Sequence, residues 1–364
     1  MKAGIVGLPN VGKSTLFNCL SNAKAQSANF PFCTIEPNIG VVNVPDNRLT
    51  TLENLVNPQN VLPATVEIVD IAGLVKGASK GEGLGNQFLG NIRETDAIIH
   101  VLRCFDNDNV VHVDTSVDPI RDKETIDIEL QLKDLETVEK KLEKVKRAAR
   151  TGNKEAQKEE AALLKTKTAL ESGQSVRAIS YTDDERKDYI RPLQLLTDKP
   201  ILYVCNVDET SAKSGNEYVE KVKKAIADEN SEVIVLAVAT EADIAELETY
   251  EERQLFLDDL GLEEAGVSKL IRAAYKLLNL QTYFTAGEKE VRAWTIKTGS
   301  TAPQAAGVIH TDFEKGFIRA EVIKYDDYVK YKSEAKVREA GKLAVEGKEY
   351  IVQDGDIMHF RFNV

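Results

Sequence analysis

The sequence lacks the patterns that mark several common classes of protein. Its four cysteines are far apart and form no CxxC pair, so neither a zinc site nor a disulfide framework is indicated. The four histidines form no HExxH motif. No apolar run approaches the ~18 residues that span a membrane, and the N-terminus has no charged-then-apolar leader. We therefore expect a cytoplasmic protein that contacts no membrane.

Positive charge is also scarce. The 364 residues include 47 Lys and Arg but 59 Asp and Glu, which gives a formal net charge of −12. This balance argues against a protein coated in positive charge for nucleic acid, although it is compatible with a local basic patch. Hydrophobic residues make up 42% of the chain, which is enough for extensive cores, and the length predicts two or three domains.

Short apolar runs alternate with helical stretches over most of residues 1–260. The runs lie at 3–8, 39–44, 65–72, 97–104, 201–205 and 233–238. Each has the length of a strand, is rich in Val and Ile, and is followed by Gly, Pro, Asp or Asn. Strands separated by helices indicate βαβ units, so the predicted fold class is α/β, with a mostly parallel sheet covered on both faces.

The alternation breaks between Pro119 and Pro192. Apolar residues recur there at spacings of three and four, which predicts one apolar stripe along a helix: Leu132, Leu135, Val138, Leu142, Val145 and Ala149. A turn at 151–153 and a second seam with Leu163 and Leu170 complete the pattern. We expect an antiparallel helical hairpin at about 125–192 that interrupts the first domain.

The middle of this segment is basic. From Lys140 to Lys154 there are seven basic residues and one acidic residue, Glu143, a local net charge of +6 that leaves −18 on the rest of the chain. We interpret this face as a docking surface; the alternative is an ordinary solvated helix surface.

The pattern changes again after Lys276. Short strand-like runs at 291–296, 316–322, 350–352 and 358–362 are joined by Gly and Asp turns, and acidic and basic residues nearly balance. We therefore expect a first domain at 1–276 and a small mixed domain at 277–364.

Residues 7–14, Gly-Leu-Pro-Asn-Val-Gly-Lys-Ser, match the phosphate-binding motif GxxxxGKS. The motif follows an apolar strand and precedes a predicted helix at 15–20, which is the context that it requires. Its backbone N–H groups and the helix N-terminus supply partial positive charge to a phosphate. The alternative is a chance glycine-rich turn. The predicted nucleotide contacts of this loop are Asn10, Val11, Gly12, Lys13, Ser14 and Thr15. Lys13 would reach the β- and γ-phosphates, and the Ser14 hydroxyl would bind Mg²⁺.

A second phosphate element lies downstream. An apolar strand ends in Asp70 and is followed by Ile-Ala-Gly73, which gives the DxxG pattern. We expect Asp70 to hold the Mg²⁺ shell and the Gly73 N–H to meet the γ-phosphate, as in a GTPase-type switch fold. Thr34, between the two motifs, is a candidate for a second Mg²⁺ ligand that is in place only with the γ-phosphate bound. The alternative is a turn threonine.

The element that would bind the base departs from the GTPase pattern. GTPases of this fold carry Asn-Lys-x-Asp after a buried strand, whereas this chain has Asn206-Val207-Asp208-Glu209. Val207 shortens the aliphatic stem beside the base, and Glu209 adds a methylene at the carboxylate that would pair with guanine. We interpret the base as adenine, or as weakly discriminated. In the alternative, Asp208 takes the pairing position.

The catalytic element departs as well. Ras-like proteins orient the attacking water with a glutamine just after DxxG, but Leu74 stands there and has no hydrogen-bonding group. Five glycines in residues 73–85 predict a switch that nucleotide orders. Asn10 is a candidate to coordinate K⁺, and His112 is a candidate general base. The bare sequence favours a surface-loop histidine at 112.

Together these residues resemble the YchF/Obg-like ATPase family of P-loop NTPases. The similarity runs over essentially the whole chain and includes residues 7–14, 29–34, 70–78 and 280–285. The phosphate loop alone is common, whereas an Asn-x-x-Glu base motif together with Leu74 is far more specific.

The resemblance implies an Obg-type nucleotide domain with an inserted coiled-coil hairpin and a C-terminal TGS domain of β-grasp fold. It implies slow Mg²⁺-dependent hydrolysis of ATP, with some activity on GTP, and association with the ribosome. It assigns the base contacts to Asn206, Val207 and Glu209 and a catalytic role to His112, which reverses the preference drawn from the bare sequence. We expect a monomeric regulatory ATPase that meets the ribosome or its RNA through the hairpin and the TGS domain. The alternatives are an Obg-type GTPase and a ribosome- or RNA-binding module with incidental hydrolysis.

Overall fold

The computed structural model describes residues 1–22, 39–71, 84–110, 112, 116–229 and 231–363. The chain packs as two units, one formed by Met1–Gly40 with Glu67–Leu270 and the other by Val41–Val66 with Ile271–Val364. The second unit is therefore composite, because an early segment of the chain packs with the C-terminal residues. The division predicted at residue 276 keeps all of residues 1–276 in one domain, whereas residues 41–66 pack with the C-terminal residues.

The first sheet contains the six strands that the apolar runs predict. In spatial order these are β2 (Ile39–Asn43), β4 (Thr65–Asp70), β1 (Lys2–Val6), β5 (Ala97–Arg103), β6 (Ile201–Asn206) and β7 (Glu232–Leu236). β1 pairs in parallel with β4 and β5, and the pairs β5–β6 and β6–β7 are also parallel. Every residue of β5 and β6 is buried, as expected for inner strands covered on both faces. Because β1, β4, β5, β6 and β7 are parallel, their carboxyl ends and the loops that follow share one edge of the sheet.

Among the described residues, five helices belong with this sheet, and a sixth, α10, begins in the first unit and ends in the second. They are α1 (Lys13–Asn22), α3 (Leu84–Arg93), α7 (Glu217–Ala225), α8 (Val238–Glu246), α9 (Tyr250–Asp259) and α10 (Gly266–Leu277). Short helical turns fill the connections between the longer elements. They are η1 (Val176–Ala178), α6 (Asp183–Glu185), η2 (Arg186–Ile190), η3 (Arg191–Leu193), η4 (Leu196–Asp198) and η5 (Glu209–Ser211).

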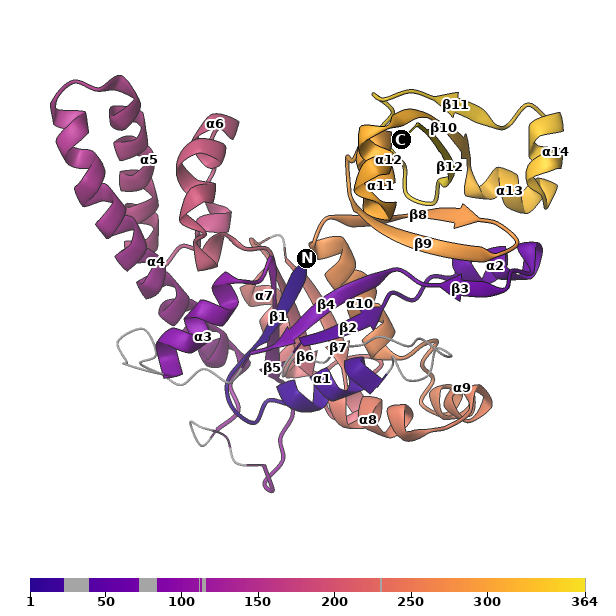
Figure 1. Cartoon of the computed structure of the whole chain (residues 1–364). Coiled ribbons are helices and arrows are strands. Elements are labelled where there is room, and N and C mark those ends of the chain that lie inside the picture. The colour runs from indigo at the N-terminus through magenta and orange to yellow at the C-terminus, as the bar shows by residue number, and fades with distance from the viewer. Residues whose placement is uncertain (23–38, 72–83, 111, 113–115, 230, 364) are drawn as a thin grey trace. The chain divides into compact units, whose positions relative to one another are not determined.

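Helices α4 (Pro119–Arg150) and α5 (Lys154–Glu171) form a hairpin (Figure 1). Asp118 caps α4 with its carboxylate, and Pro119 lies in the first turn, where its missing N–H removes no helical bond. The seam between the helices buries the expected residues Val138, Leu142, Val145, Ala149, Leu163 and Leu170. Leu132 is 39% exposed, so its placement in the seam was wrong. The reason is that α5 has already ended at this level, where Gln131 donates a hydrogen bond to the Gly173 carbonyl.

The second sheet belongs to the composite unit. Its spatial order is β11 (Ala344–Glu346), β10 (Phe317–Ile323), β12 (Ile357–Phe362), β8 (Leu280–Ala286), β9 (Glu290–Lys297) and β3 (Asn60–Leu62). The helices of this unit are α2 (Asn47–Val56), α11 (Ala302–Ile309), α12 (Thr311–Lys315), α13 (Tyr325–Tyr331) and α14 (Glu334–Glu339). The predicted strand at 350–352 was wrong, since Ile351 forms an isolated bridge with Thr301 and no ladder. β3 comes from the early segment and lies parallel to β9.

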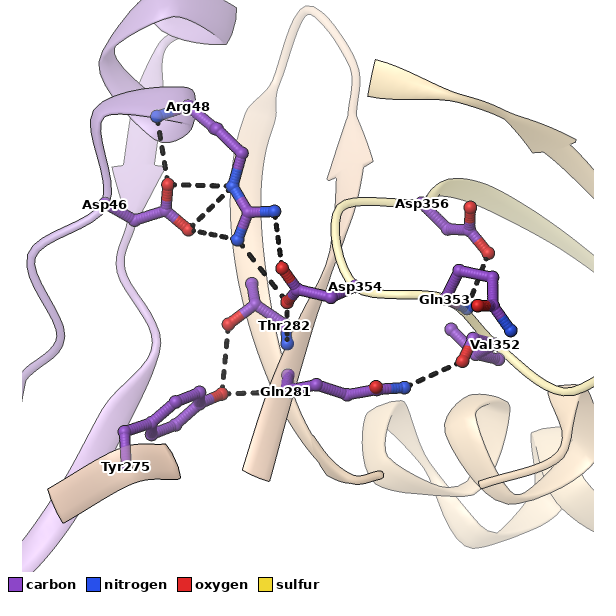
Figure 2. A network of polar contacts seen from close by, with 9 residues as sticks. All are labelled: Asp46, Arg48, Tyr275, Gln281, Thr282, Val352, Gln353, Asp354 and Asp356. Carbon is purple, nitrogen blue, oxygen red and sulfur yellow. Dashed lines mark hydrogen bonds and ion pairs between the residues drawn. The ribbon is translucent and has the colours of Figure 1, made fainter. Parts of the chain in front are cut away.

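A polar network fixes the early segment within the second unit (Figure 2). The Arg48 guanidinium donates to Asp46 at 2.8 Å and to Asp354 at 2.7 Å, so it joins parts of the chain that are far apart in sequence. Asp354 in turn accepts a bond from the Thr282 N–H at 2.9 Å. The Tyr275 hydroxyl lies 3.0 Å from the hydroxyl of Thr282. These charged bonds define where residues 41–66 sit on this sheet, in addition to the β3–β9 pairing.

Within the described part of the chain, no helix combines the length and the apolarity needed to cross a membrane.

Candidate functional site

The phosphate-binding motif forms the loop between β1 and α1. The loop spans residues 7–12, and α1 begins at Lys13. Gly12 has a φ of 99°, and a Cβ added there would lie 2.6 Å from the side-chain nitrogen of Asn206. A Cβ at Gly7, with a φ of 155°, would lie 2.6 Å from a backbone carbonyl oxygen of β5. Both positions require glycine, because the backbone conformation and the close approach exclude a side chain.

Lys13 is buried at the start of α1. Its Nζ atom donates a hydrogen bond to the Leu8 carbonyl at 2.6 Å, so the side chain folds back over the loop. Burial lowers the pKa of Lys13 to about 8, and the nearby Asp70 carboxylate opposes that shift. A bound phosphate would replace the Leu8 carbonyl as the partner and favour the charged form of the lysine. The loop therefore holds an ammonium group ready for an anion.

Ser14 and Asp70 lie side by side at the carboxyl edge of the sheet. The Ser14 hydroxyl donates to Asp70 Oδ2 at 3.3 Å. The other carboxylate oxygen, Oδ1, is buried and has no hydrogen-bond partner among the described residues. Hydroxyl and carboxylate oxygens are ligands that Mg²⁺ accepts, and this ion takes only one or two protein ligands when phosphates supply others. The residues present therefore fit Mg²⁺.

Asn206 connects the phosphate loop to the start of α8. Its Nδ2 donates to the Val11 carbonyl at 2.9 Å, and its Oδ1 accepts from the Val238 N–H at 3.0 Å. The side chain is almost fully buried. Both functional atoms of the amide are engaged by backbone groups, so Asn206 fixes the phosphate loop relative to the end of β7 and the start of α8.

The three residues after Asn206 differ in their environments. Val207 is buried, and Glu209 is exposed. The Asp208 carboxylate accepts bonds from the Thr210 hydroxyl at 2.6 Å and the Ser211 N–H at 3.0 Å. These bonds, the one from Thr210 above all, hold the pKa of Asp208 below its usual range. Because Asp208 acts as a helix cap, the alternative that it pairs with the base is disfavoured, and Glu209 remains the available carboxylate.

His112 is buried rather than placed on a surface loop. Its Nε2 lies 2.8 Å from Asp122 Oδ2, and the side chains are 3% and 2% exposed. Arg121 also contacts Asp122, with its guanidinium 3.2 Å from Oδ1. Burial raises the pKa of Asp122, and the hydrogen bond from His112 acts against that shift. His112 is therefore held by the first turn of α4.

Other predicted site residues lie outside the described residues or in exposed positions. Thr34, Gly73 and Leu74 fall outside, as does most of the glycine-rich stretch at 73–85, so their assigned roles remain predictions. Asn10 and Thr15 are exposed. Asn10 has a φ of 63°, a left-handed conformation that asparagine tolerates better than most residues. Its assignment to K⁺ also remains a prediction.

Two contributors were not predicted from the sequence. The Val238 N–H follows β7, and its position could have been found because the ends of neighbouring parallel strands meet at one edge. Asp122 carries no comparable signal, because its contact with His112 depends on the path of the loop between β5 and α4.

The fold and the site together define a class. The first strand of the sheet leads through GxxxxGKS into a helix, and an aspartate stands at the end of the neighbouring parallel strand. This is the arrangement of a P-loop nucleotide-binding protein of the GTPase type.

Comparisons with known proteins identify the family. Residues 2–141 match the family described as 50S ribosome-binding GTPase, and residues 280–363 match YchF-GTPase_C, described as a protein of unknown function. The chain is 56% identical over 366 residues to the ribosome-binding ATPase YchF of Bacillus subtilis (strain 168), covering 100% of both chains. It is 58% identical over 363 residues to the ribosome-binding ATPase YchF of Escherichia coli O157:H7, covering 100% of this chain and 99% of the other. The structure of the Schizosaccharomyces pombe YchF GTPase matches with a TM-score of 0.90 at 42% identity, over 99% of this chain and 97% of the other. The chain therefore belongs to the YchF family.

Proposed function

We propose that this protein is a Mg²⁺-dependent ATPase that converts ATP to ADP and phosphate and acts in the cytoplasm as a ribosome-associated switch. The observation that carries the proposal is the arrangement of Lys13, Ser14 and Asp70 around one loop, a buried ammonium group beside a hydroxyl–carboxylate pair. The relatives that are 56% and 58% identical are named ribosome-binding ATPases, which supports the same activity here.

The chain's own groups have distinct tasks in this reaction. The N–H groups of the loop from Asn10 to Thr15 hold the phosphates, and Lys13 stabilises the charge that develops on the γ-phosphate. Ser14, Asp70 and Thr34 would hold Mg²⁺, and this ion when bound would supply neutralising charge to the phosphates. The Gly73 N–H binds a γ-phosphate oxygen, and His112 accepts the proton of the attacking water. Asn10 would help to hold K⁺, which would supply positive charge in place of an arginine.

The selection of adenine follows from Asn206–Glu209. Val207 provides apolar contact, and Glu209 provides a carboxylate displaced from the position that pairs with guanine. Asp208 accepts a hydrogen bond from the Ser211 N–H, so it does not provide a carboxylate for the base in place of Glu209.

A second candidate, an Obg-type GTPase, is favoured by the match of residues 2–141 to a GTPase family and by the GTPase name of the S. pombe relative. Equilibrium competition between labelled ATP and GTP decides between them. A preference for GTP of tenfold or more would reject adenine as the favoured base.

The Lys13→Ala variant tests the activity itself. Removal of the buried ammonium group should lower the hydrolysis rate roughly 100-fold or more, because electrostatic stabilisation of the transferred phosphoryl group depends on it. Lys158→Ala, at an exposed lysine of α5, is the matched control and should hydrolyse ATP at the parental rate. Hydrolysis by Lys13→Ala at the parental rate would show that this loop does not perform the reaction.

We assign the ribosomal contact to the basic end of the α4–α5 hairpin and to the C-terminal unit, which we interpret as a TGS domain of β-grasp fold. Several cations near the turn of the hairpin are exposed, namely Lys140, Lys144, Arg147, Arg150 and Lys154. Exposed cations on one projection favour phosphate groups of ribosomal RNA as the partner. The same surface would serve a ribosome-binding module whose hydrolysis is incidental, and Lys13→Ala separates the two, since such a module would bind ribosomes and function without hydrolysis. We propose that the active form is the monomer.

A further inference from the structure

The second sheet is divided along its middle. β12 and β8 are neighbouring parallel strands, but their register contains a single pair, Ile357 with Phe284. Pairing on either side is extensive, because β9 pairs with the whole of β8 and β10 pairs with the whole of β12. At the single pair the Phe284 N–H donates to the Asp356 carbonyl at 2.8 Å. Beyond it the described residues of the two strands, which end at Ala286 and Phe362, do not pair with each other. The division is therefore closed at one end and open at the other.

A pocket of about 570 Å³ occupies the open end, and we call it the β8–β12 slot. It is lined on the β8 side by residues 285–290 and on the β12 side by residues 357–360 and 362. Helices α11, α12, α13 and α14 each add one side chain to its walls: Ile309, Phe313, Tyr328 and Glu334. All of these residues lie in the second unit. Ligand pockets typically enclose roughly 300–1,000 Å³, so the slot can hold part of a partner molecule.

The backbone of β8 directs hydrogen-bonding groups toward the slot. Gly287 and Glu290 exchange two backbone hydrogen bonds across the β8–β9 turn, at 3.0 and 3.2 Å. Hydrogen-bonded and non-hydrogen-bonded pairs alternate along an antiparallel ladder, so the next pair, Ala286 with Val291, is not hydrogen-bonded. The N–H and carbonyl of Ala286 therefore point away from β9 and toward the slot.

The backbone of β12 contributes in the same way from the other side. The Asn363 N–H donates to the Gly316 carbonyl, just before β10, at 2.9 Å. Successive residues of a strand direct their backbone groups to opposite sides, so Phe360 directs its N–H and carbonyl away from β10 and toward the slot. Among the described residues, no further strand pairs with β8 or β12 along the slot. Two strand edges therefore face each other across the slot, and open edges of this kind accept an additional strand.

Side chains give the slot two faces of different character. Met358 and Phe360 are 2% and 8% exposed and pack in the hydrophobic cluster together with Phe313. Side chains alternate along a strand, so His359 lies on the opposite face, where it stands across from Glu321 of β10. An added strand would therefore present apolar side chains to one face and polar side chains to the other.

The charge of the lining is mainly negative. Its acidic and basic side chains are four glutamates and one lysine: Glu288, Glu290, Glu321, Glu334 and Lys289. Glu321 and Glu334 pair with Arg338. Within the described part of the chain, Glu288 and Glu290 form no ion pair. These two carboxylates lie at the β8–β9 turn and favour a cationic partner over a polyanion such as RNA.

We propose that the β8–β12 slot binds an extended segment of a partner protein in which apolar and basic side chains alternate. The segment adds a strand between β12 and β8 and bonds to the backbone of Phe360 and Ala286. Its apolar side chains contact Met358 and Phe313, and its basic side chains face the glutamates. The site lies in the second unit and its occupation does not require hydrolysis of ATP.

Fluorescence anisotropy of a labelled Lys-Val-Lys-Val-Lys-Val peptide, titrated with the full chain, tests the binding. The peptide should bind about tenfold or more tightly than Lys-Lys-Lys-Val-Val-Val, because only the alternating sequence buries its valines on one face. Glu-Val-Glu-Val-Glu-Val should bind about tenfold or more weakly than the lysine peptide. Equal affinity for the alternating and block peptides would overturn the proposal, since it would reflect general attraction to an acidic protein. Displacement of the peptide by single-stranded oligoadenylate would assign the slot to RNA and would also overturn it.

Hydrogen exchange of the full chain shows where the peptide binds. Binding should slow exchange of the Ala286 and Phe360 amides about tenfold or more, because both then donate to the added strand. The amide of His359, which is directed to β10, should exchange at an unchanged rate. Binding without slower exchange at Ala286 and Phe360 would place the peptide elsewhere and reject the slot.

Two sets of variants complete the test. Ala286→Pro removes one N–H from the edge and should weaken peptide binding about tenfold, whereas Ala286→Ser keeps the N–H and should bind as the parent does. If the proline variant fails to fold, the double variant Glu288→Lys with Glu290→Lys should weaken binding about tenfold by repulsion. Its matched control reverses two exposed acids of the first unit, Glu246 and Glu251, to lysine and should bind as the parent does. Equal weakening by the two double variants would attribute binding to net charge and refute the slot.

Discussion

The two ends of helix α4 differ in whether their charged side chains are buried or exposed. Toward the N-terminus, several polar or charged side chains are buried, namely Asp122, Lys123, Asp127, Glu129, Gln131 and Asp134. Toward the C-terminus the exposed cations Lys140, Lys144, Arg147 and Arg150 dominate. The helix α4 thus combines an N-terminal part whose charged side chains are buried with a solvated, basic C-terminal part.

The difference shows what burial demands of a charge. Lys123 is tolerated inside because Asp127 and Glu229 pair with it, and such pairing has to be geometrically complete to offset desolvation. Asp134 accepts three hydrogen bonds from Leu196 and Thr197, although burial still raises its pKa to about 6. The cations at the other end meet no such requirement and can adapt to a polyanion. The buried N-terminal part of α4 therefore fixes the direction of the helix, and the cations at its C-terminal end attract a polyanion.

The largest effect on the free energy of unfolding is expected from removing the ion pairs of Lys123 in the N-terminal part of α4. Lys123→Ala removes the cation nearest to the buried Asp127 and the partly buried Glu229 and leaves them only Arg177, at 4.0 Å from each. This should lower the free energy of unfolding by about 3 kcal/mol or more. Urea denaturation followed by circular dichroism measures the change. Lys140→Ala is the matched control, since Lys140 also pairs on α4, with Glu136, but is 69% exposed. The control should cost less than about 1 kcal/mol. Equal losses of unfolding free energy in the two variants would contradict the contrast between the buried N-terminal part of α4 and its exposed C-terminal part.

A smaller loss should follow removal of the Asp134 carboxylate. Asp134→Ala leaves the N–H groups of Leu196 and Thr197 without acceptors, but it also removes a carboxylate whose burial is unfavourable. We expect a loss of about 2–3 kcal/mol, together with faster hydrogen exchange at those two amides. Glu136→Ala, at a half-exposed carboxylate of the same helix, should leave their exchange unchanged. Unchanged protection in Asp134→Ala would mean that other contacts hold this turn against α4.

The smallest free-energy effect is expected at the basic end. Reversing Lys144, Arg147 and Arg150 to glutamate should change stability by less than about 1 kcal/mol. It should weaken ribosome co-sedimentation about tenfold or more and reduce the salt dependence of binding, because fewer counterions are released. The control reverses three exposed lysines of α7, Lys221, Lys223 and Lys224, and so matches the change in net charge. If the reversals on α4 and on α7 weaken ribosome binding equally, the effect comes from the net charge of the protein and not from the basic end of α4.

Local patterns predicted much of the first unit. The six apolar runs became the six strands of the first sheet, because continuous Val- and Ile-rich segments are typical of strands covered on both faces. The phosphate loop was predicted from residues 7–14, since its glycines, lysine and serine serve a function within one short segment. The seam of the hairpin was also confirmed, apart from Leu132, because helical periodicity is a local property.

Contacts between distant segments could not be predicted in this way. β8 was missed because Leu280–Ala286 has few β-branched apolar residues and depends on pairing with β9. The burial of His112 depends on a carboxylate in another element, and the sequence alone suggested a surface position. The bond between Arg48 and Asp354 joins residues whose proximity no local period encodes.

The composite second unit also constrains how this chain can be divided. A fragment of residues 277–364 would lack β3 and Arg48, so β9 would present an open strand edge and Asp354 would lose its guanidinium partner. Open edges promote aggregation. Conversely, a chain shortened after residue 276 would retain β3 and Arg48 without their partners β9 and Asp354. The two units therefore have to be kept in one chain when the protein is truncated or engineered, even though most of the second unit lies at residues 271–364.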